Sequence, residues 1–596
     1  MQPSTVRAFQ WLHTWAGICA GFALFIAFVG GTLTMFHDEI GRWERPISRH
    51  LRIDGGPAQR LVGTLVALHP KAADNFGVVL ATETHREPYV YWNDGSDWLQ
   101  ARLAEGSKSP LDTSLGFDDF SKDSTSAAEQ ADIAQRAHLK KLEAERNERN
   151  ASAARVASAT GHPAPAVSPV SEPFNPSVML VDHDTLDLST GPDLSEFIDR
   201  LHYSLALPEF GLYLMGIVSL MFGVALVSGF MTHWPRLTRD LFALRPGSNL
   251  KMFWQDTHNA VGVLALPFHA VIAITGCVLC LGLVAAMLFN SIAFNGELMQ
   301  EITSMRSSVP PAPVIAVPGK PTEVDGLVAR ARAEAPGFTP RWIAYTRYGA
   351  DDGTAEVWGD SDRALGSLGS VLMRLNDGKV LAHQTAAMRD VNHTVSSAVY
   401  GLHFGSFGGL VVRWIYFVLG VTGAVLVFTG NLLWIEARRK RSHDDQPLST
   451  RNIARATIGI CVGSCASIAF AFDVALIVPS FDAWSVYLAA LCAAGVWAIA
   501  RAPIRAARDL LCATALFAAL VPVLDALLTS DNLVSSLLAR DWQLASIDLA
   551  GLVFAALFAV LAAMTHRRGR DGDPNSVWAA PVHGPVPQLR RRDSTT

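Results

Sequence analysis

The sequence lacks the features that build secreted disulfide domains, nucleotide-binding domains and nucleic-acid interfaces. Its 596 residues include only seven cysteines, all inside long apolar runs, so the polar segments between those runs hold no disulfide. No G-x-G-x-x-G follows a predicted strand, which leaves no fingerprint for a flavin or nicotinamide cofactor. Charged residues make up 17% of the chain and the net charge is −5, which argues against a nucleic-acid partner.

Long apolar runs are abundant instead. Eight of them are long enough, or nearly so, to span a bilayer at about 20 residues each. We place them near 12–36, 211–234, 257–289, 409–435, 455–478, 483–501, 507–528 and 544–565. Four basic segments then fall on one side of the membrane: 236–251, 438–455, 501–508 and 567–570. The positive-inside rule makes that side cytoplasmic, with both termini inside.

These runs predict an α-helical polytopic membrane protein of about eight transmembrane helices with two external α+β modules. The predicted boundaries are spans within 1–36, 201–236, 251–289 and 401–440, modules at 37–200 and 290–400, a four-helix extension at 451–566 and a disordered tail at 567–596. Residues 101–175 of the first module are rich in Ala, Ser, Glu and Lys, which is typical of a helical or disordered insertion.

Each predicted module has a helical pattern followed by strands. In the first module the strand patterns are FGVVLATET, PYVYWND and VMLVDHDTLDLST. In the second they are RWIAYTRYG, TAEVWGD and VLMRLNDGKVLAHQT. Alternating apolar and polar residues between turn clusters predict short antiparallel strands in both.

The first four spans form an internal duplication. When WLHTWAGICAGFALFIAFVGGTL is laid over the third apolar run, His13 matches His258 without a gap. The motifs LHYS and LHFG match likewise and align His202 with His403. Matching glycines are Gly31 with Gly276 and Gly229 with Gly430. The unit of helix, external module and helix therefore occurs twice in the same orientation, as in repeats related by an axis along the membrane normal.

The matched histidines predict a cofactor site, because imidazole inside a bilayer is costly and usually functional. His13 and His258 lie near the cytoplasmic face, and His202 and His403 lie at the external ends of the second and fourth helices. Two neutral imidazoles facing each other across a helix bundle are the axial ligands of a b-type haem, so we expect about two haems. Nearby glycines would let a flat ring approach closely: Gly17, Gly262, Gly405 and Gly408.

Two further histidines break the symmetry. The repeat counterparts of His37 and His269 are Gly282 and Leu24. On a straight helix His269 lies eleven residues beyond His258, about 16 Å deeper, where it either ligates the outer haem or relays protons. Zinc is an alternative for these histidines, but no H-x-x-x-H motif or thiolate companion supports it.

The blocks WLHTWAG, LHYSLALP, HNAVGVLALPFH and LHFGSFGG resemble the PepSY-associated transmembrane-helix family over residues 1 to about 440. The resemblance implies two periplasmic PepSY-like modules, a dihaem core in the bacterial inner membrane, and one-electron reduction of ferric siderophores. The histidines carried over from these blocks are His13, His202, His258, His269 and His403. Since the chain has no flavin or nicotinamide motif, quinol or a separate reductase would donate the electrons. The four C-terminal helices and the insertion at 101–175 depart from the simplest family members.

Two other classes of function stay open at this point. A transporter would place a substrate site in the middle of the membrane and would explain the parallel repeats without haem. A regulatory protein would use the PepSY-like modules to bind peptides or inhibit a peptidase, with the helices serving as anchors. An absorbance spectrum of the purified protein separates these classes from a haem protein.

Overall fold

A computed structural model describes most of the chain outside the predicted insertion. The described residues are 2–44, 56–68, 70–80, 88–92, 178–181, 184–187, 194–208, 210–234, 250–294, 314–361, 364–386, 391–439, 446–478, 481–529, 531–573 and 576–578. The predicted insertion at 101–175 lies outside them.

Seven of the described helices or helical runs are long and apolar enough to cross a membrane, and a bent pair of helices supplies an eighth span. The seven are α1 (Pro3–Thr34), α7 (Phe210–His233), α14 (Gly409–Ala437), the run Leu448–Ile477, α17 (Ala483–Ala500), α18 (Pro503–Leu528) and α20 (Trp542–Asp571). The run Leu448–Ile477 consists of α15 (Leu448–Ala456), a π-helical turn and α16 (Gly463–Ile477). They overlap the predicted apolar runs, which confirms the polytopic helical fold.

The third span is broken. It consists of α9 (Leu250–Leu264) and α10 (Leu266–Ala293), whose axes meet at 68°. Pro267 lies in the first turn of α10, where it lacks an N–H group and its ring would clash with the carbonyl four residues earlier in a continuous helix. The prediction of one straight helix was therefore wrong, and so was the depth of His269 derived from it.

Two short helices precede the second and fourth spans. They are α6 (Leu194–Ser204) and α13 (Val391–Phe404), whereas α7 begins at Phe210 and α14 at Gly409. The chain turns between each pair through residues with positive φ: Leu205, Ala206, Gly405 and Gly409. His202 and His403 accordingly lie on separate short helices, and the predicted starts of these spans at 201 and 401 were too early.

The spans of the duplicated half form one bundle. In this bundle α1 packs against α7 and α14, α10 packs against α7, and α9 packs against α14. Small residues permit this packing, as membrane helices require. A Cβ added at Gly423 of α14 would collide with the ring of Phe28 on α1.

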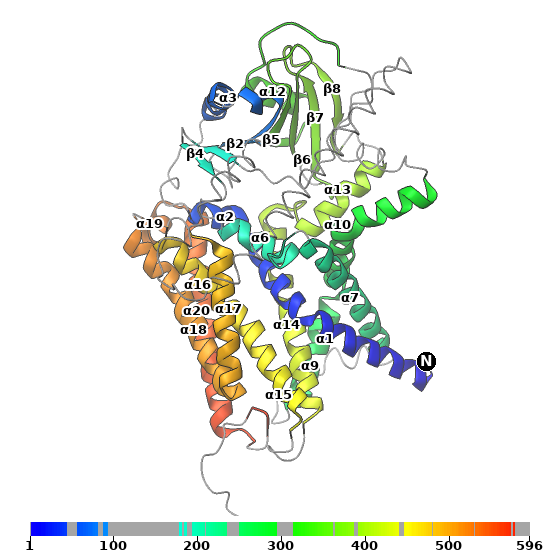
Figure 1. Cartoon of the computed structure of the whole chain (residues 1–596), viewed down its shortest axis with the longest axis vertical. Helices are drawn as coiled ribbons and strands as arrows, with labels where there is room; N and C mark the ends of the chain where they lie inside the picture. The colour runs from blue at the N-terminus through cyan, green and yellow to red at the C-terminus, as the bar shows by residue number, and fades with distance from the viewer. Residues whose placement is uncertain are drawn as a thin grey trace, which may run out of the picture. The chain divides into compact units, whose positions relative to one another are not determined.

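The described strands form one eight-stranded sheet in the order β4-β3-β2-β1-β5-β6-β7-β8 (Figure 1). The first half holds β1 (Asn75–Val79), β2 (Tyr89–Trp92), β3 (Val178–Val181) and β4 (Asp184–Asp187). The second half holds β5 (Phe338–Thr346), β6 (Thr354–Ser361), β7 (Leu368–Arg374) and β8 (Val380–Gln384). Each strand overlaps a predicted pattern, although β5 and β7 each begin three residues before theirs.

The two predicted modules share this sheet, which corrects the expectation of two separate ones. Antiparallel β1 and β5 join the halves, with Gly77 opposite Ala344. Each half alone would expose an unpaired strand edge, and the central pairing satisfies both edges. The helices α3 (Gly56–Leu68) and α12 (Val324–Glu334) are linked by a 2.8 Å hydrogen bond from the Val324 N–H to the Gln59 side chain.

The C-terminal helices α16, α17, α18 and α20 lie side by side (Figure 1). Leu432 and Ile435 of α14 share a buried cluster with Ile458 and Leu510, which fixes this group to the bundle. On the short helix α2 (His37–Trp43), Arg42 forms an ion pair with Asp541 at 2.6 Å.

The first residues of the predicted disordered tail are structured. The helix α20 continues to Asp571, and Val577 and Trp578 are 4% and 8% exposed. These two side chains join the same buried cluster as Leu432, so the apolar pair within the polar tail packs rather than extending into solvent.

Candidate functional site

The inner histidine pair joins the first and third spans. His13 lies on α1 and His258 on α9, and their ring centroids are 6.1 Å apart with an angle of 70° between the ring planes. Both side chains are partly buried. The structure thus brings together the two residues that the duplication aligns.

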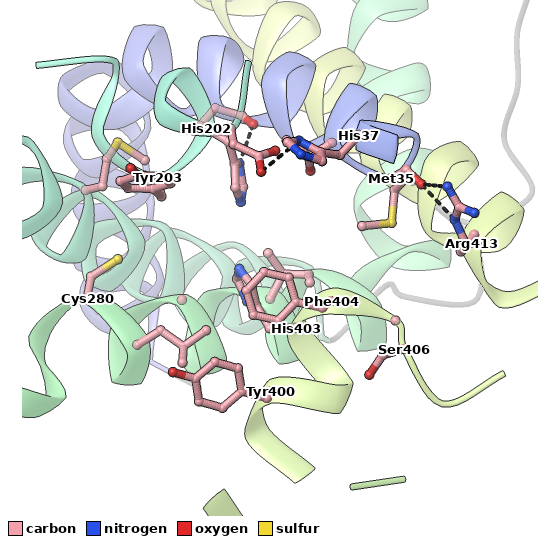
Figure 2. A pocket seen from close by; sticks show the side chains of 18 of the residues that line it. Met35, His37, His202, Tyr203, Cys280, Tyr400, His403, Phe404, Ser406 and Arg413 are labelled. Carbon is pink, nitrogen blue, oxygen red and sulfur yellow. Dashed lines mark hydrogen bonds and ion pairs between the residues drawn. The ribbon is translucent and has the colours of Figure 1, made fainter. Parts of the chain in front are cut away.

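The outer pair joins the two short helices. His202 of α6 and His403 of α13 have ring centroids 5.9 Å apart, and the rings point toward one another across an open space (Figure 2). These helices lie outside the membrane-spanning segments. Burial, and then the neighbouring His202, lowers the pKa of His403 to about 3, so its imidazole is neutral.

All four histidines are held through Nδ1. The Nδ1 atom of His13 lies 2.8 Å from the Ala225 carbonyl, and that of His202 lies 2.8 Å from the Ala27 carbonyl. The Nδ1 atom of His258 lies 3.0 Å from the Leu426 carbonyl. Because a carbonyl only accepts, Nδ1 carries the proton in these three rings, which leaves Nε2 with a free lone pair.

His403 reaches the same tautomer by a different route. Its Nδ1 lies 2.9 Å from the Thr275 hydroxyl, and that hydroxyl donates to the Val271 carbonyl at 2.7 Å. With its single proton engaged there, the hydroxyl accepts from Nδ1–H of His403. An Nδ1–H hydrogen bond to a fixed acceptor is the usual support for an imidazole that ligates metal through Nε2.

The spacing within each pair fits one metal ion between two rings. Two metal–imidazole bonds of about 2 Å each, with the ring radii added, separate the ring centroids by roughly 6 Å. The measured centroid separations are 6.1 Å for the inner pair and 5.9 Å for the outer pair. The four residues therefore suit two bis-histidine sites.

Each imidazole also packs against a glycine of another helix. A Cβ added at Gly31 would lie 2.6 Å from the His202 ring, and one at Gly229 would lie 2.9 Å from the His13 ring. The corresponding distances are 3.2 Å from Gly430 to His258 and 3.4 Å from Gly276 to His403. These are the two glycine pairs that match in the duplication.

The glycines expected to let a flat ring approach do not pack against the histidine rings. An added Cβ at Gly17 would have nothing within 4 Å, and those at Gly262, Gly405 and Gly408 would first meet Leu426, Tyr416 and Val412. Gly405 also lines a cavity together with His202 and His403. The close contacts with the histidine rings come instead from glycines of other helices.

A cavity of about 650 Å³ surrounds the outer pair. Its volume lies within the range of about 300–1,000 Å³ that is common for cofactor and ligand sites. His202 and His403 line it together with Gly276, and it extends to Arg341 and Trp342 on β5. The cavity therefore connects the outer pair with the sheet.

Charged side chains lie at the edge of this cavity. His37 Nδ1 is 3.1 Å from the Asp199 carboxylate (Figure 2). Its Nε2 is 3.8 Å from the Glu196 carboxylate. Burial alone would lower the pKa of His37, but the adjacent Asp199 carboxylate and the charges of Glu196 and Asp38 raise it to about 10. His37 is thus an imidazolium, which excludes it as a metal ligand in this arrangement.

His269 belongs to neither pair. It is fully buried on α10, with ring centroids 5.7 Å from Phe28 and 5.8 Å from Phe222. Its Nε2 lies 3.4 Å from the Thr422 hydroxyl, and its Nδ1 has no hydrogen-bond partner among the described residues. His202 and His403 face one another, whereas His269 packs against Phe28 and Phe222, so its expected role as an alternative outer ligand stays a prediction.

Comparison with known protein families identifies the family of this chain. The sequence profile of the PepSY-associated TM region matches residues 10–437. The chain belongs to this family. The match ends with the last residue of α14, so the C-terminal helices of this PepSY-associated TM protein lie beyond it.

One relative of this PepSY-associated TM protein is the uncharacterized protein PA4219 of Pseudomonas aeruginosa. The two are 27% identical over 332 residues, which covers 51% of this chain and 82% of the relative. The similarity supports the family and says nothing further about the reaction.

Sequence reasoning missed several residues that hold the histidines. Thr275 has no threonine counterpart in the first repeat, where the matching residue is Gly30, so the repeat pattern gave no signal for it. The carbonyls of Ala225, Ala27 and Leu426 carry no side-chain signature at all. The matched glycines were visible in the alignment, and their meaning is clear only once the helices are packed.

Proposed function

We propose that this protein is a dihaem b oxidoreductase of the bacterial inner membrane that reduces ferric siderophores in the periplasm by one electron. The observation that carries the proposal is the arrangement of the four paired histidines. Each has Nδ1 within 3.0 Å of a fixed acceptor, and each ring centroid lies 5.9 or 6.1 Å from its partner.

The histidines divide into two sets with separate roles in this proposal. His13 and His258 would hold the inner group, and His202 and His403 the outer one. A bound b-type haem supplies one-electron redox chemistry, with its potential set by the axial ligands and their hydrogen bonds. The side chains contribute neutral Nε2 ligands, fixed ring orientations and the apolar surroundings of Phe28 and Phe222.

The proposed substrate class is the one that the family resemblance implies, and the lining of the cavity is compatible with it. Arg341, Trp342 and Asp360 of the sheet line the cavity of the outer pair, so a complex in the external compartment would approach from the sheet. Ferric iron held by hard oxygen ligands binds less tightly after one-electron reduction, and the iron is then released. Since the sequence has no flavin or nicotinamide motif, quinol or a separate reductase on the cytoplasmic side would be the electron donor.

A spectrum and a single-turnover reaction test the proposal. Purified full-length protein should show a Soret band, and a pyridine haemochrome assay should give about two haem b per chain. After reduction and removal of excess reductant, mixing with a ferric hydroxamate or catecholate complex should reoxidise the protein and yield Fe²⁺ in a ferrous trap. Protein without haem b would contradict the cofactor, and haem protein that no ferric complex reoxidises would contradict the substrate.

A further inference from the structure

A second cavity lies in the C-terminal helices, far along the chain from all four paired histidines. It has a volume of about 210 Å³ and lies between the first turns of α18 and the last turns of α20. Four basic side chains line it: Arg505, Arg508, His566 and Arg570. The proposed redox function makes no use of these residues.

The charges around this cavity do not cancel. Arg508 pairs with Asp509 at 2.6 Å and Arg570 pairs with Asp571 at 2.7 Å. Arg505 forms no ion pair with any residue that the structure describes. Three guanidinium groups against two carboxylates leave a positive excess, which favours an anion over a neutral ligand.

The two helices approach closely at the cavity. Gly569 sets the distance between them, since a Cβ there would lie 3.2 Å from the Ile504 side chain. The basic side chains are the main donors here, because Pro503 has no N–H and the amides of Arg505 and Ala506 donate to the Ala502 carbonyl.

The surface around this cavity favours a lipid over a free anion. Both helices are membrane spans, and only 17% of the apolar window of α20 is buried inside the protein. One turn from the cavity, Leu561 and Met564 are 37% and 60% exposed, so apolar surface continues directly from the basic side chains. A ligand with an anionic head and acyl chains would contact both surfaces.

We propose that this cavity binds the phosphate of an anionic glycerophospholipid at the basic end of α18 and α20. Basic pockets between membrane helices on the cytoplasmic side are typical binding sites for acidic lipid headgroups. The C-terminal helices, which lie beyond the family match, would then carry a lipid site that is independent of the histidine pairs.

Native mass spectrometry of the full-length protein in detergent tests this proposal. Dioleoylphosphatidylglycerol should bind more tightly than dioleoylphosphatidylcholine. The double variant Arg505→Gln/Arg570→Gln should weaken phosphatidylglycerol binding by roughly 25-fold, because each arginine contributes about a factor of five. The matched control Arg567→Gln/Arg568→Gln removes the same charge from the end of α20 outside the cavity and should change affinity by less than about threefold.

The variant Gly569→Leu tests the site without changing any charge. It takes the place of the arginine double variant if that variant does not elute as a folded protein. It fills the cavity, so phosphatidylglycerol binding should fall while all charges stay. Equal binding of the two lipids, or an equal loss in the control variant, would overturn the proposal. So would inorganic phosphate binding that depends on Arg505 and Arg570 while phosphatidylglycerol binding does not, since the site would then serve a free anion.

Discussion

The inner and outer histidine pairs have nearly the same ring separation, 6.1 and 5.9 Å, in different settings. The inner pair is held by two backbone carbonyls of the spans α7 and α14. The outer pair is held by one carbonyl and by the Thr275 hydroxyl, and it borders a cavity that reaches the sheet. A single substitution cannot remove a backbone carbonyl, but it can remove the Thr275 hydroxyl. The outer pair is therefore the one whose hydrogen bonding to a histidine can be altered by changing a side chain.

The largest expected effect comes from replacing a single histidine, either in the inner or in the outer pair. Both His403→Leu and His258→Leu should lower the haem content from about two to about one per chain, because an imidazole deprived of its axial partner holds haem weakly. Pyridine haemochrome measures the content. In the proposed reaction, the quinol or reductase acting as donor should still reduce the haem that remains in His403→Leu. In His258→Leu only dithionite should do so, and equal donor reduction in both variants would show that the pairs are not separate inner and outer sites.

Replacing the glycine beside each ring of the outer pair by alanine should affect His202 more than His403. In Gly31→Ala the new methyl group would lie 2.6 Å from the His202 ring, whereas in Gly276→Ala it would lie 3.4 Å from the His403 ring. Overpacking of the first kind costs about 1–3 kcal/mol. Gly31→Ala should therefore lose outer haem on purification while Gly276→Ala retains more of it. Equal retention would mean that the His202 ring moves freely.

Removing the Thr275 hydroxyl tests whether the outer pair is the tunable one. In Thr275→Val, His403 Nδ1 loses its acceptor, and haem affinity at the outer site should fall about 10–100-fold. The matched control is Thr429→Val, because His258 keeps the Leu426 carbonyl at 3.0 Å and the Thr429 hydroxyl is only a secondary contact at 3.4 Å. Haem retention in a competition with apomyoglobin measures both, and equal losses would contradict the difference between the pairs.

The smallest effect concerns the charged edge of the outer cavity. The pKa of His37 is raised from 6.5 to about 10, so its ion pair with Asp199 stabilises the folded state fully below pH 6.5. This stability is lost progressively as the pH rises from 6.5 toward 10. The difference in melting temperature between the native protein and His37→Gln should shrink over that interval. A difference that grows with pH would show that His37 is neutral in the folded protein.

The spans and the strands were predictable because each carries its own pattern. Apolar length identifies a span whatever its neighbours are, and alternation identifies a strand. The pairing of His13 with His258 was also visible, since duplication places equivalent residues at one depth. Pro267 is a local signal for the bend before α10. The apolar run continues through it and by itself predicts one straight helix.

What the sequence could not supply depends on packing between distant segments. The acceptors of three histidines are backbone carbonyls, which every residue has, so no pattern distinguishes Ala27 or Ala225. The apolar pair Val577–Trp578 lies in a polar tail, and its burial depends on a surface made by α14, α18 and α20. The pairing of β1 with β5 likewise cannot be predicted from either segment alone, because it forms only when the two strand edges lie side by side.

The pairing of β1 with β5 has a consequence for how the protein is made. Residues 75–79 leave the ribosome long before residues 342–346, and two membrane helices must be inserted between them. The first half of the sheet therefore keeps an open strand edge until the second half has been synthesised. Completion of the sheet is a late step that ties the ends of both repeats together. A chain arrested after α10 should expose that edge, and should be captured by chaperones or aggregate where the finished protein does not.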